Sequence, residues 1–255
     1  MRRLLSLSAF ALAVALTGTS QAQYVINTGT AANGSGATLA DGTQDTRYNV
    51  TSYPTTSDTT TATAIGTDKT YVVNQNTFPF PAWFADSSSS KWIGPYQGGN
   101  VSTSTASLAG DYSFTTTFYL GAGVDVLTAS ISGGLWATDN AGINIILNGH
   151  STGNTQTADG YHAFVSFAIP PTLDSTHAFN NGLNTITFVV HNTPLGVTNP
   201  VGLRVEGKVI ANGPIGPNAG SVPEPASLVM FGTAFLVVSG VTWNRNRKAK
   251  AVPQS

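Results

Sequence analysis

The sequence predicts an all-β protein, a jelly-roll-like antiparallel β-sandwich that lies between two terminal targeting segments. Short runs of the chain alternate apolar and polar residues with a period of two, and turn-forming residues separate these runs. Outside the two ends, no segment keeps the 3.6-residue apolar period of an amphipathic helix. Six or more short strands bounded by turns are typical of sandwiches and jelly rolls.

The first segment, residues 1–22, has the pattern of a secretory signal peptide. Arg2 and Arg3 precede an apolar stretch over residues 4–16, and small residues stand at Ser20 and Ala22. These three parts in this order predict cleavage by signal peptidase between Ala22 and Gln23, and export of the chain. A buried N-terminal helix is the alternative interpretation.

The exported body begins with a Thr- and Gly-rich part over residues 23–77. Apolar residues at 24–26 and 71–73 predict two short strands, and residues 51–67 are expected to form a polar loop or edge. This part matches no pattern that we can assign to a family.

Residues 78–212 carry the strongest strand signals and are expected to form the sandwich domain. Turn residues at 121–123, 148–149, 170–171 and 181–182 separate the strands. Within each strand, alternate apolar residues are expected to share one face: Tyr112, Phe114, Phe118 and Leu120; Leu127, Ala129 and Ile131; Ile143, Ile145 and Leu147; Val165, Phe167 and Ile169; Ile186, Phe188 and Val190; Leu203, Val205 and Val209.

The C-terminal end predicts a membrane anchor. A linker over residues 213–225 ends in the motif Val222, Pro223, Glu224, Pro225, and an apolar run follows over residues 226–243. Eighteen helical residues span about 27 Å, close to the thickness of the hydrocarbon core of a bilayer. The basic tail over residues 244–255, which includes Arg245 and Arg247, is expected to stay cytoplasmic, so the body lies outside.

This end resembles the PEP-CTERM sorting signal, which consists of a Pro-Glu-Pro motif, one transmembrane helix and an arginine-rich terminus. The resemblance covers about the last 30 residues. It implies that an exosortase, a membrane-embedded cysteine enzyme, recognises and removes the tail. It also implies a link to extracellular polysaccharide and biofilm. A plain type I membrane anchor that is never cut is the alternative.

Composition and charge exclude several classes of protein. Charged residues make up 9% of the chain, and there is no cysteine, which rules out disulfides, thiolate metal sites and cysteine nucleophiles. Six of the eleven basic residues lie in the two ends, so residues 23–221 hold five basic and eleven acidic residues, a net charge of −6. A body of this sign lacks the positive surface that binds nucleic acid.

A second resemblance covers residues 79–210, which are similar to exported sandwich modules of the galactose-binding-like or carbohydrate-binding type. It rests on framework motifs at residues 92–93, 110–114, 136–140, 147–149, 182–188 and 202–205. Such motifs support the fold more than a particular ligand.

Aromatic residues gather at 78–84, and Trp92 and Tyr96 follow. Exposed aromatic rings stack on sugar rings, and amides bind hydroxyl groups, so Trp83, Trp92, Tyr96 and Asn148 are candidate saccharide ligands. The alternative is that the aromatic residues close the ends of the sandwich. Trp136 is expected to lie in the core.

Asp139 and Asn140 offer hard oxygen atoms of the kind that bind Ca²⁺. The second resemblance implies a structural calcium ion in such a loop, although no EF-hand-like run is present. An Asx turn, in which Asp139 bonds to its own backbone, is the alternative. No other cofactor is expected.

No catalytic constellation is visible. Residues 149–153 match the nucleophile-elbow pattern around Ser151, but no helix is predicted after it, and Asn148-Gly149 predicts a polar hairpin instead. His150, His162, His177 and His191 have no metal-ligand spacing, and no carboxylate pair stands out. We therefore expect a non-enzymatic, polysaccharide-associated module at the cell surface or in the extracellular matrix. The alternative is a structural surface protein without a ligand.

Overall fold

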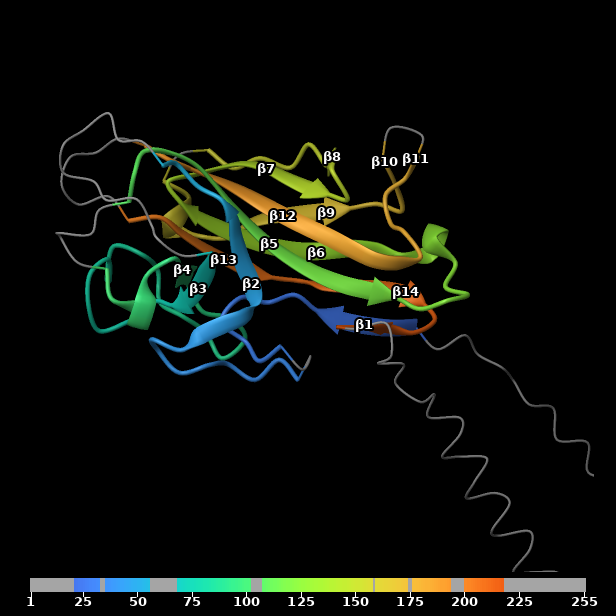
Figure 1. Cartoon of the computed structure of the whole chain (residues 1–255), viewed down its shortest axis with the longest axis horizontal. Coiled ribbons are helices and arrows are strands. Elements are labelled where there is room, and N and C mark those ends of the chain that lie inside the picture. Colours follow the sequence, from blue (N-terminus) through green and yellow to red (C-terminus); the bar gives the residue numbers. More distant parts are fainter. Residues whose placement is uncertain are drawn as a thin grey trace, which may run out of the picture.

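The protein is all-β, and its strands form a strongly curled antiparallel sheet (Figure 1). The computed structural model describes residues 21–32, 35–55, 68–101, 107–157, 159–173, 176–193 and 200–217. No α-helix occurs within these ranges, which contain only three short 3₁₀ turns, η1 (Gln97–Gly99), η2 (Val126–Thr128) and η3 (Gly160–His162). The core of the expected signal peptide and the proposed C-terminal motif, helix and tail lie outside the described residues.

Within the described ranges, thirteen strands belong to one continuous sheet, and β10 (Thr172–Leu173) and β11 (Thr176–His177) form a separate pair. The strands of the large sheet are β1 (Gln21–Val25), β2 (Gln44–Ser52), β3 (Lys69–Val72), β4 (Ile93–Gly94), β5 (Gly110–Leu120), β6 (Ser130–Asp139), β7 (Ala141–Leu147), β8 (His150–Ser151), β9 (Val165–Ile169), β12 (Gly182–Asn192), β13 (Gly202–Glu206), β14 (Lys208–Asn212) and β15 (Ile215–Gly216).

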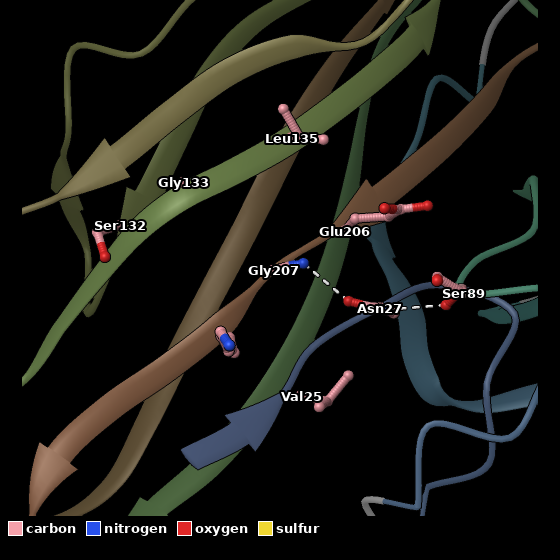
Figure 2. Close-up of a pocket in the computed structure, with 9 residues that line it drawn as sticks. Val25, Asn27, Ser89, Ser132, Gly133, Leu135, Glu206 and Gly207 are labelled. Carbon is pink, nitrogen blue, oxygen red and sulfur yellow. Dashed lines mark hydrogen bonds between the residues drawn. The ribbon is translucent and has the colours of Figure 1, made fainter. Parts of the chain in front are cut away.

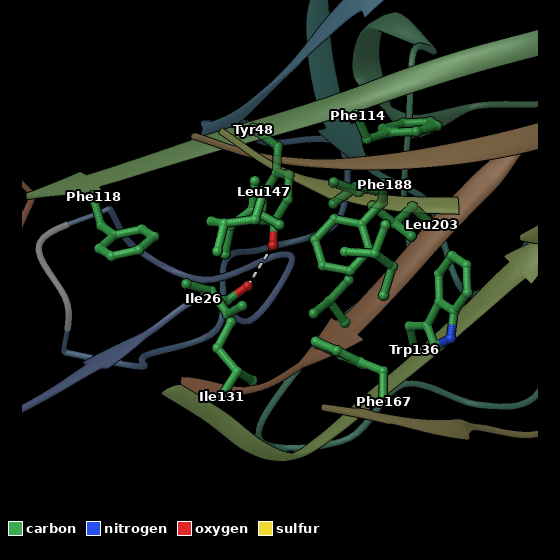
Figure 3. Close-up of a cluster of buried hydrophobic side chains, with 14 of the residues drawn as sticks. Ile26, Tyr48, Phe114, Phe118, Ile131, Trp136, Leu147, Phe167, Phe188 and Leu203 are labelled. Carbon is green, nitrogen blue, oxygen red and sulfur yellow. Dashed lines mark hydrogen bonds between the residues drawn. The ribbon is translucent and has the colours of Figure 1, made fainter. Parts of the chain in front are cut away.

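The sheet has two flanks that face each other across the core. One flank contains β2, β5, β12, β7 and β8, the other contains β1, β14, β6, β13 and β9, and β3 and β4 connect them. Aromatic pairs bridge the flanks, because the ring of Phe188 on β12 lies 6.0 Å from that of Trp136 and 5.8 Å from that of Phe167. Figure 3 shows these side chains converging in the centre. This burial supplies the main driving force for folding.

The Thr- and Gly-rich part contributes strands to this same sheet. β1 pairs with β14 over five residues, and β2 pairs with β5. Arg47 on β2 donates hydrogen bonds to the carbonyl oxygens of Val25 and Ala31, and its guanidinium lies over the ring of Tyr24. Residues 23–77 and 78–212 therefore share one hydrogen-bonded framework.

The alternation predicted for the central strands is confirmed on β5 and β12, whereas on β13 both faces are buried from Gly202 to Val205. Phe114, Phe118, Ile186 and Phe188 are fully buried, and so is Leu203. Trp136 is also buried, as expected for a core residue.

Three apolar residues of the expected buried faces are exposed instead. Leu127 lies in η2, not in a strand, and 51% of its surface is exposed. Ile143 precedes a shift in register between β7 and β12, and Val165 opens β9, which pairs with β6 alone in the described part of the chain. A 3₁₀ turn, a register shift or a sheet edge decides exposure at these three positions, so alternation in the sequence does not fix which face is covered.

Candidate functional site

The aromatic residues that the sequence offers as sugar platforms lie inside the protein. Trp83 and Trp92 are 2% and 0% exposed, and their ring centroids are 4.4 Å apart. Tyr96 is buried as well, and its hydroxyl forms hydrogen bonds with Ser107 Oγ and with the backbone N–H of Val201. Stacking on a sugar needs an open ring face, so this geometry corresponds to the alternative that these rings close one end of the fold.

Asn148 also has a structural role. It has a φ of 52° in the turn between β7 and β8, where its amide donates to Ala178 O and Asn184 Oδ1 and its Oδ1 accepts from the N–H of Thr185. All of its side-chain atoms are engaged by the protein. The hairpin predicted at Asn148-Gly149 is confirmed, since β8 pairs directly with β7.

Ser151, the serine of the elbow-like motif, lies on β8 rather than at the start of a helix. Its hydroxyl donates to Asn144 Oδ1 and accepts from the N–H of Gly153. No histidine contact to this hydroxyl occurs among the described residues. This geometry is that of a polar hairpin.

Asp139 and Asn140 lie at the end of β6, beneath η3. Asp139 Oδ2 accepts a 2.9 Å hydrogen bond from the indole of Trp83, whereas Asp139 Oδ1 is buried without a partner. Burial raises the pKa of the Asp139 carboxyl to about 7, the Trp83 hydrogen bond opposes this rise, and the charge of Asp159 adds to it. Asn140 Oδ1 accepts from the N–H of Thr193.

This arrangement offers few ligands for the calcium ion considered above. Ca²⁺ takes six to eight oxygen ligands, and Asp139 Oδ1 is one unpartnered oxygen. Within the part of the chain that the structure describes, no three His, Cys, Asp or Glu residues are grouped so that they could hold a metal ion.

A shallow groove lies on the outer surface of the flank that contains β1, β6, β13 and β14. Polar groups from four separate parts of the chain line it. Its volume is about 230 Å³, and its lining residues are Val25, Asn27, Ser89, Ser132, Gly133, Leu135, Glu206, Gly207 and Lys208 (Figure 2). We refer to these residues as the glycine groove, because Gly133 and Gly207 lie between its polar ends.

An irregularity in the sheet creates this groove. β6 pairs with β13 up to Leu135 opposite Glu206, and with β14 from Ile131 opposite Val209. Between these pairs β6 has three residues and the facing chain has two, so β6 bulges outward. Gly133 has a φ of +66°, which suits the bulge because glycine has no Cβ to strain it. No heavy atom lies within 4 Å of the position that a Cβ on Gly133 would take.

Glu206 is held in one orientation at the edge of the groove. Its Oε1 accepts hydrogen bonds from Ser87 Oγ at 2.9 Å and from Ser90 Oγ at 2.8 Å. Ser90 Oγ in turn accepts from Arg204 Nε at 2.8 Å, and Arg204 Nη2 lies 3.7 Å from Glu206 Oε1. Every contact to the Glu206 carboxylate uses Oε1. The other, Oε2, has no partner within the described ranges.

The remaining polar groups of the groove are either fixed or free. Asn27 is fixed, since its amide donates to Ser89 O and its Oδ1 accepts from the N–H of Gly207 (Figure 2). Lys208 Nζ makes a long contact of 3.3 Å with Gln23 Oε1. The hydroxyls of Ser89 and Ser132 have no side-chain partner among the described residues, and both line the groove. The site thus offers two hydroxyls and one carboxylate oxygen to a ligand.

None of the groove residues was expected from the sequence. The available signal was Gly133-Gly134 within one strand and Gly207 between two others, because glycine inside a strand often marks a bulge. Nothing in the sequence indicated that residues 133–134 and Gly207 are neighbours in the sheet.

The chain matches no known family model, no curated protein and no solved structure. No helix within the described ranges is long and apolar enough to cross a membrane.

Proposed function

We propose that this chain is an exported cell-surface or extracellular-matrix protein whose tail is a PEP-CTERM signal, and whose body is a non-enzymatic module associated with polysaccharide. One observation carries the proposal, namely the order of Pro223-Glu224-Pro225, an 18-residue apolar run and a basic tail. An exosortase-type enzyme would remove this tail after signal peptidase has cut before Gln23.

The body supports an extracellular location. Few of its residues are charged, and its curled antiparallel sheet has two flanks with a shared core. We infer that this sheet is a jelly-roll-like β-sandwich of the kind found in exported binding modules. The glycine groove is a concave surface with several free polar groups, as expected for a binding protein.

β1 begins at Gln21, two residues before the proposed N-terminus of the mature protein. Cleavage before Gln23 would leave three residues of β1, including Tyr24, which is buried against the core. The pairs of Tyr24 with Val209 and of Val25 with Lys208 would remain.

The test is intact-mass measurement of the protein from the envelope and the culture medium of the native host. The proposal predicts an N-terminus at Gln23 and a C-terminus near Pro225, and predicts that deletion of the exosortase leaves the tail uncut. Replacement of Pro223 and Pro225 by Ala should also block removal of the tail. A full-length, unprocessed chain in the soluble cytosolic fraction would refute both export and sorting.

Association with polysaccharide is tested separately by pull-down with the host's own extracellular polysaccharide. Retention of the processed protein on this material supports the binding module. Loss of binding to every preparation would leave the sorting proposal intact and would favour the structural alternative.

A row of threonine hydroxyls favours that alternative, a structural surface protein retained as a type I membrane protein. On the outer face of β2, β5 and β12, Thr115 Oγ1 lies 2.8 Å from Thr51 Oγ1 and 3.0 Å from Thr187 Oγ1. This row offers neutral polar groups to a second copy of the chain, and the exposed pair of Asp111 and His191 lies on the same face. Sedimentation at increasing concentration tests this, and Thr187→Lys should abolish any association that uses this face.

A further inference from the structure

We propose that the glycine groove is a binding site for one ring of an uncharged saccharide. The proposal rests on the polysaccharide association proposed above, and it adds the location of the site and the charge class of its ligand. Four features support it, namely the size of the groove, its unpartnered polar groups, its rigidity and its charge.

The size limits the ligand. A volume of about 230 Å³ is below the roughly 300–1,000 Å³ of sites for drug-sized molecules. The groove is open along the surface, so a single ring of a longer polymer fits without burial of its neighbours. The aliphatic side chains of Val25 and Leu135 can cover the C–H groups of such a ring.

The polar groups match a ligand with many hydroxyls. Glu206 Oε2 accepts hydrogen bonds, whereas the hydroxyls of Ser89 and Ser132 both donate and accept. A sugar presents adjacent hydroxyls that can donate to the carboxylate and still accept from a serine. An apolar ligand would leave all three groups desolvated and unpaired, which is costly.

The groove is also rigid before any ligand binds. Ser87, Ser90 and Arg204 fix one oxygen of Glu206, and Asn27 bridges Ser89 to Gly207. Little side-chain freedom is therefore lost on binding at this edge, which favours affinity in a small site.

The charge of Glu206 disfavours acidic sugars. The unpartnered Glu206 oxygen repels a carboxylate or sulfate, and the net charge of −6 on residues 23–221 acts in the same direction. The positive charge of Lys208, at the opposite end of the groove, repels a cationic sugar. Uncharged sugars are therefore favoured over both uronic acids and amino sugars.

Binding to one ring is expected to be weak. A polymer offers many rings, and a surface carries many copies of the protein, so the measured avidity of the surface should greatly exceed the affinity of one groove. The test must therefore use soluble oligosaccharides and measure single-site affinity.

The experiment titrates the full chain in detergent micelles with oligosaccharides of dextran, cellulose and mannan as neutral probes, oligogalacturonate as the acidic probe and chitosan oligomers as the amine probe. Saturation-transfer NMR and calorimetry report binding.

Glu206→Gln keeps an acceptor for Ser87 and Ser90 but replaces Oε2 with an amide donor, and Ser132→Ala removes an exposed hydroxyl at little risk to the fold. Asp125→Asn and Ser113→Ala are matched controls outside the groove.

We expect at least one neutral probe to bind, with affinity reduced about tenfold by Glu206→Gln and severalfold by Ser132→Ala, and unchanged in both controls. Neutral binding that neither groove variant weakens would overturn the groove while leaving polysaccharide association in place. Preferential binding of oligogalacturonate or chitosan would overturn the charge assignment. If no probe and no host polysaccharide bind, the groove and the polysaccharide association both fail, while the sorting proposal still depends on its own test.

Discussion

Asp139→Asn should remove a large part of the pH dependence of stability. The carboxyl of Asp139 is 4% exposed, and its pKa is raised from 3.8 to about 7, first by burial and then by the charge of Asp159, against the hydrogen bond from Trp83. The folded protein therefore binds a proton that the unfolded chain has already lost between pH 4 and pH 7. Stability must fall as the pH rises through this window.

The magnitude follows from the two pKa values. A rise of about three pKa units corresponds to about 4 kcal/mol over the whole titration, and about 2–3 kcal/mol of this is lost between pH 5 and pH 8. Asparagine has nearly the same shape, can still accept the Trp83 hydrogen bond and does not titrate. Between pH 5 and pH 8, the free energy of unfolding of the variant should therefore fall by about 2–3 kcal/mol less than that of the wild type.

The assay is urea denaturation of the purified protein at several pH values between 5 and 8, with the free energy of unfolding extrapolated to water. Burial also raises the pKa values of Asp45 and Asp86 to about 6, so the variant should still become less stable as the pH rises. Asp125→Asn, at an exposed position, is the control. Equal losses of stability in wild type and Asp139→Asn would refute the reasoning.

Three further predictions test the packing. Gly142→Ala should destabilise the protein by about 1–3 kcal/mol, because the new Cβ would lie 2.2 Å from the Trp136 ring. At Gly207 the nearest atom to such a Cβ is 3.4 Å away, so Gly207→Ala should lower the melting temperature less. Arg204→Met should cost about 3–5 kcal/mol in urea denaturation, because Arg204 is 1% exposed, and its loss removes the donor to Ser90 Oγ and the positive charge beside Glu206; a loss below about 1 kcal/mol would contradict this. Asn148→Ala should be less stable than Asn148→Gly by about 1 kcal/mol, since only the alanine is strained at a φ of 52°, and equal melting temperatures would argue against this turn.

Much of the fold could be predicted from alternation and turn chemistry, because both are local properties. The run from Tyr112 to Leu120 and the Asn148-Gly149 turn each contain the information that determines their structure. Alternation failed at Leu127, Ile143 and Val165, where a 3₁₀ turn, a register shift or a sheet edge decides exposure. Such features depend on which strand lies next to the residue, and the local sequence does not determine that neighbour.

The candidate site was harder to predict for the same reason. The glycine groove joins Val25, Ser89, Gly133 and Glu206, which are distant in the sequence and meet only through the order of strands in the sheet. The prediction from Trp83, Trp92 and Tyr96 used residue type alone. An aromatic residue suits a sugar platform and a core equally well, and only its exposure distinguishes the two.

The antiparallel pairing of β1 with β14 has a consequence for a tethered protein. Gln21 faces Asn212 at one end of this ladder, and Val25 faces Lys208 at the other, about 14 Å away. Gln21 and Asn212 therefore lie at the same end of the ladder, and the glycine groove lies at the other end, next to Val25 and Lys208. Under the proposed sorting, the uncut tail would fix how far the groove stands from the membrane, and removal of the tail would let the body rotate freely and present Lys208 in any direction.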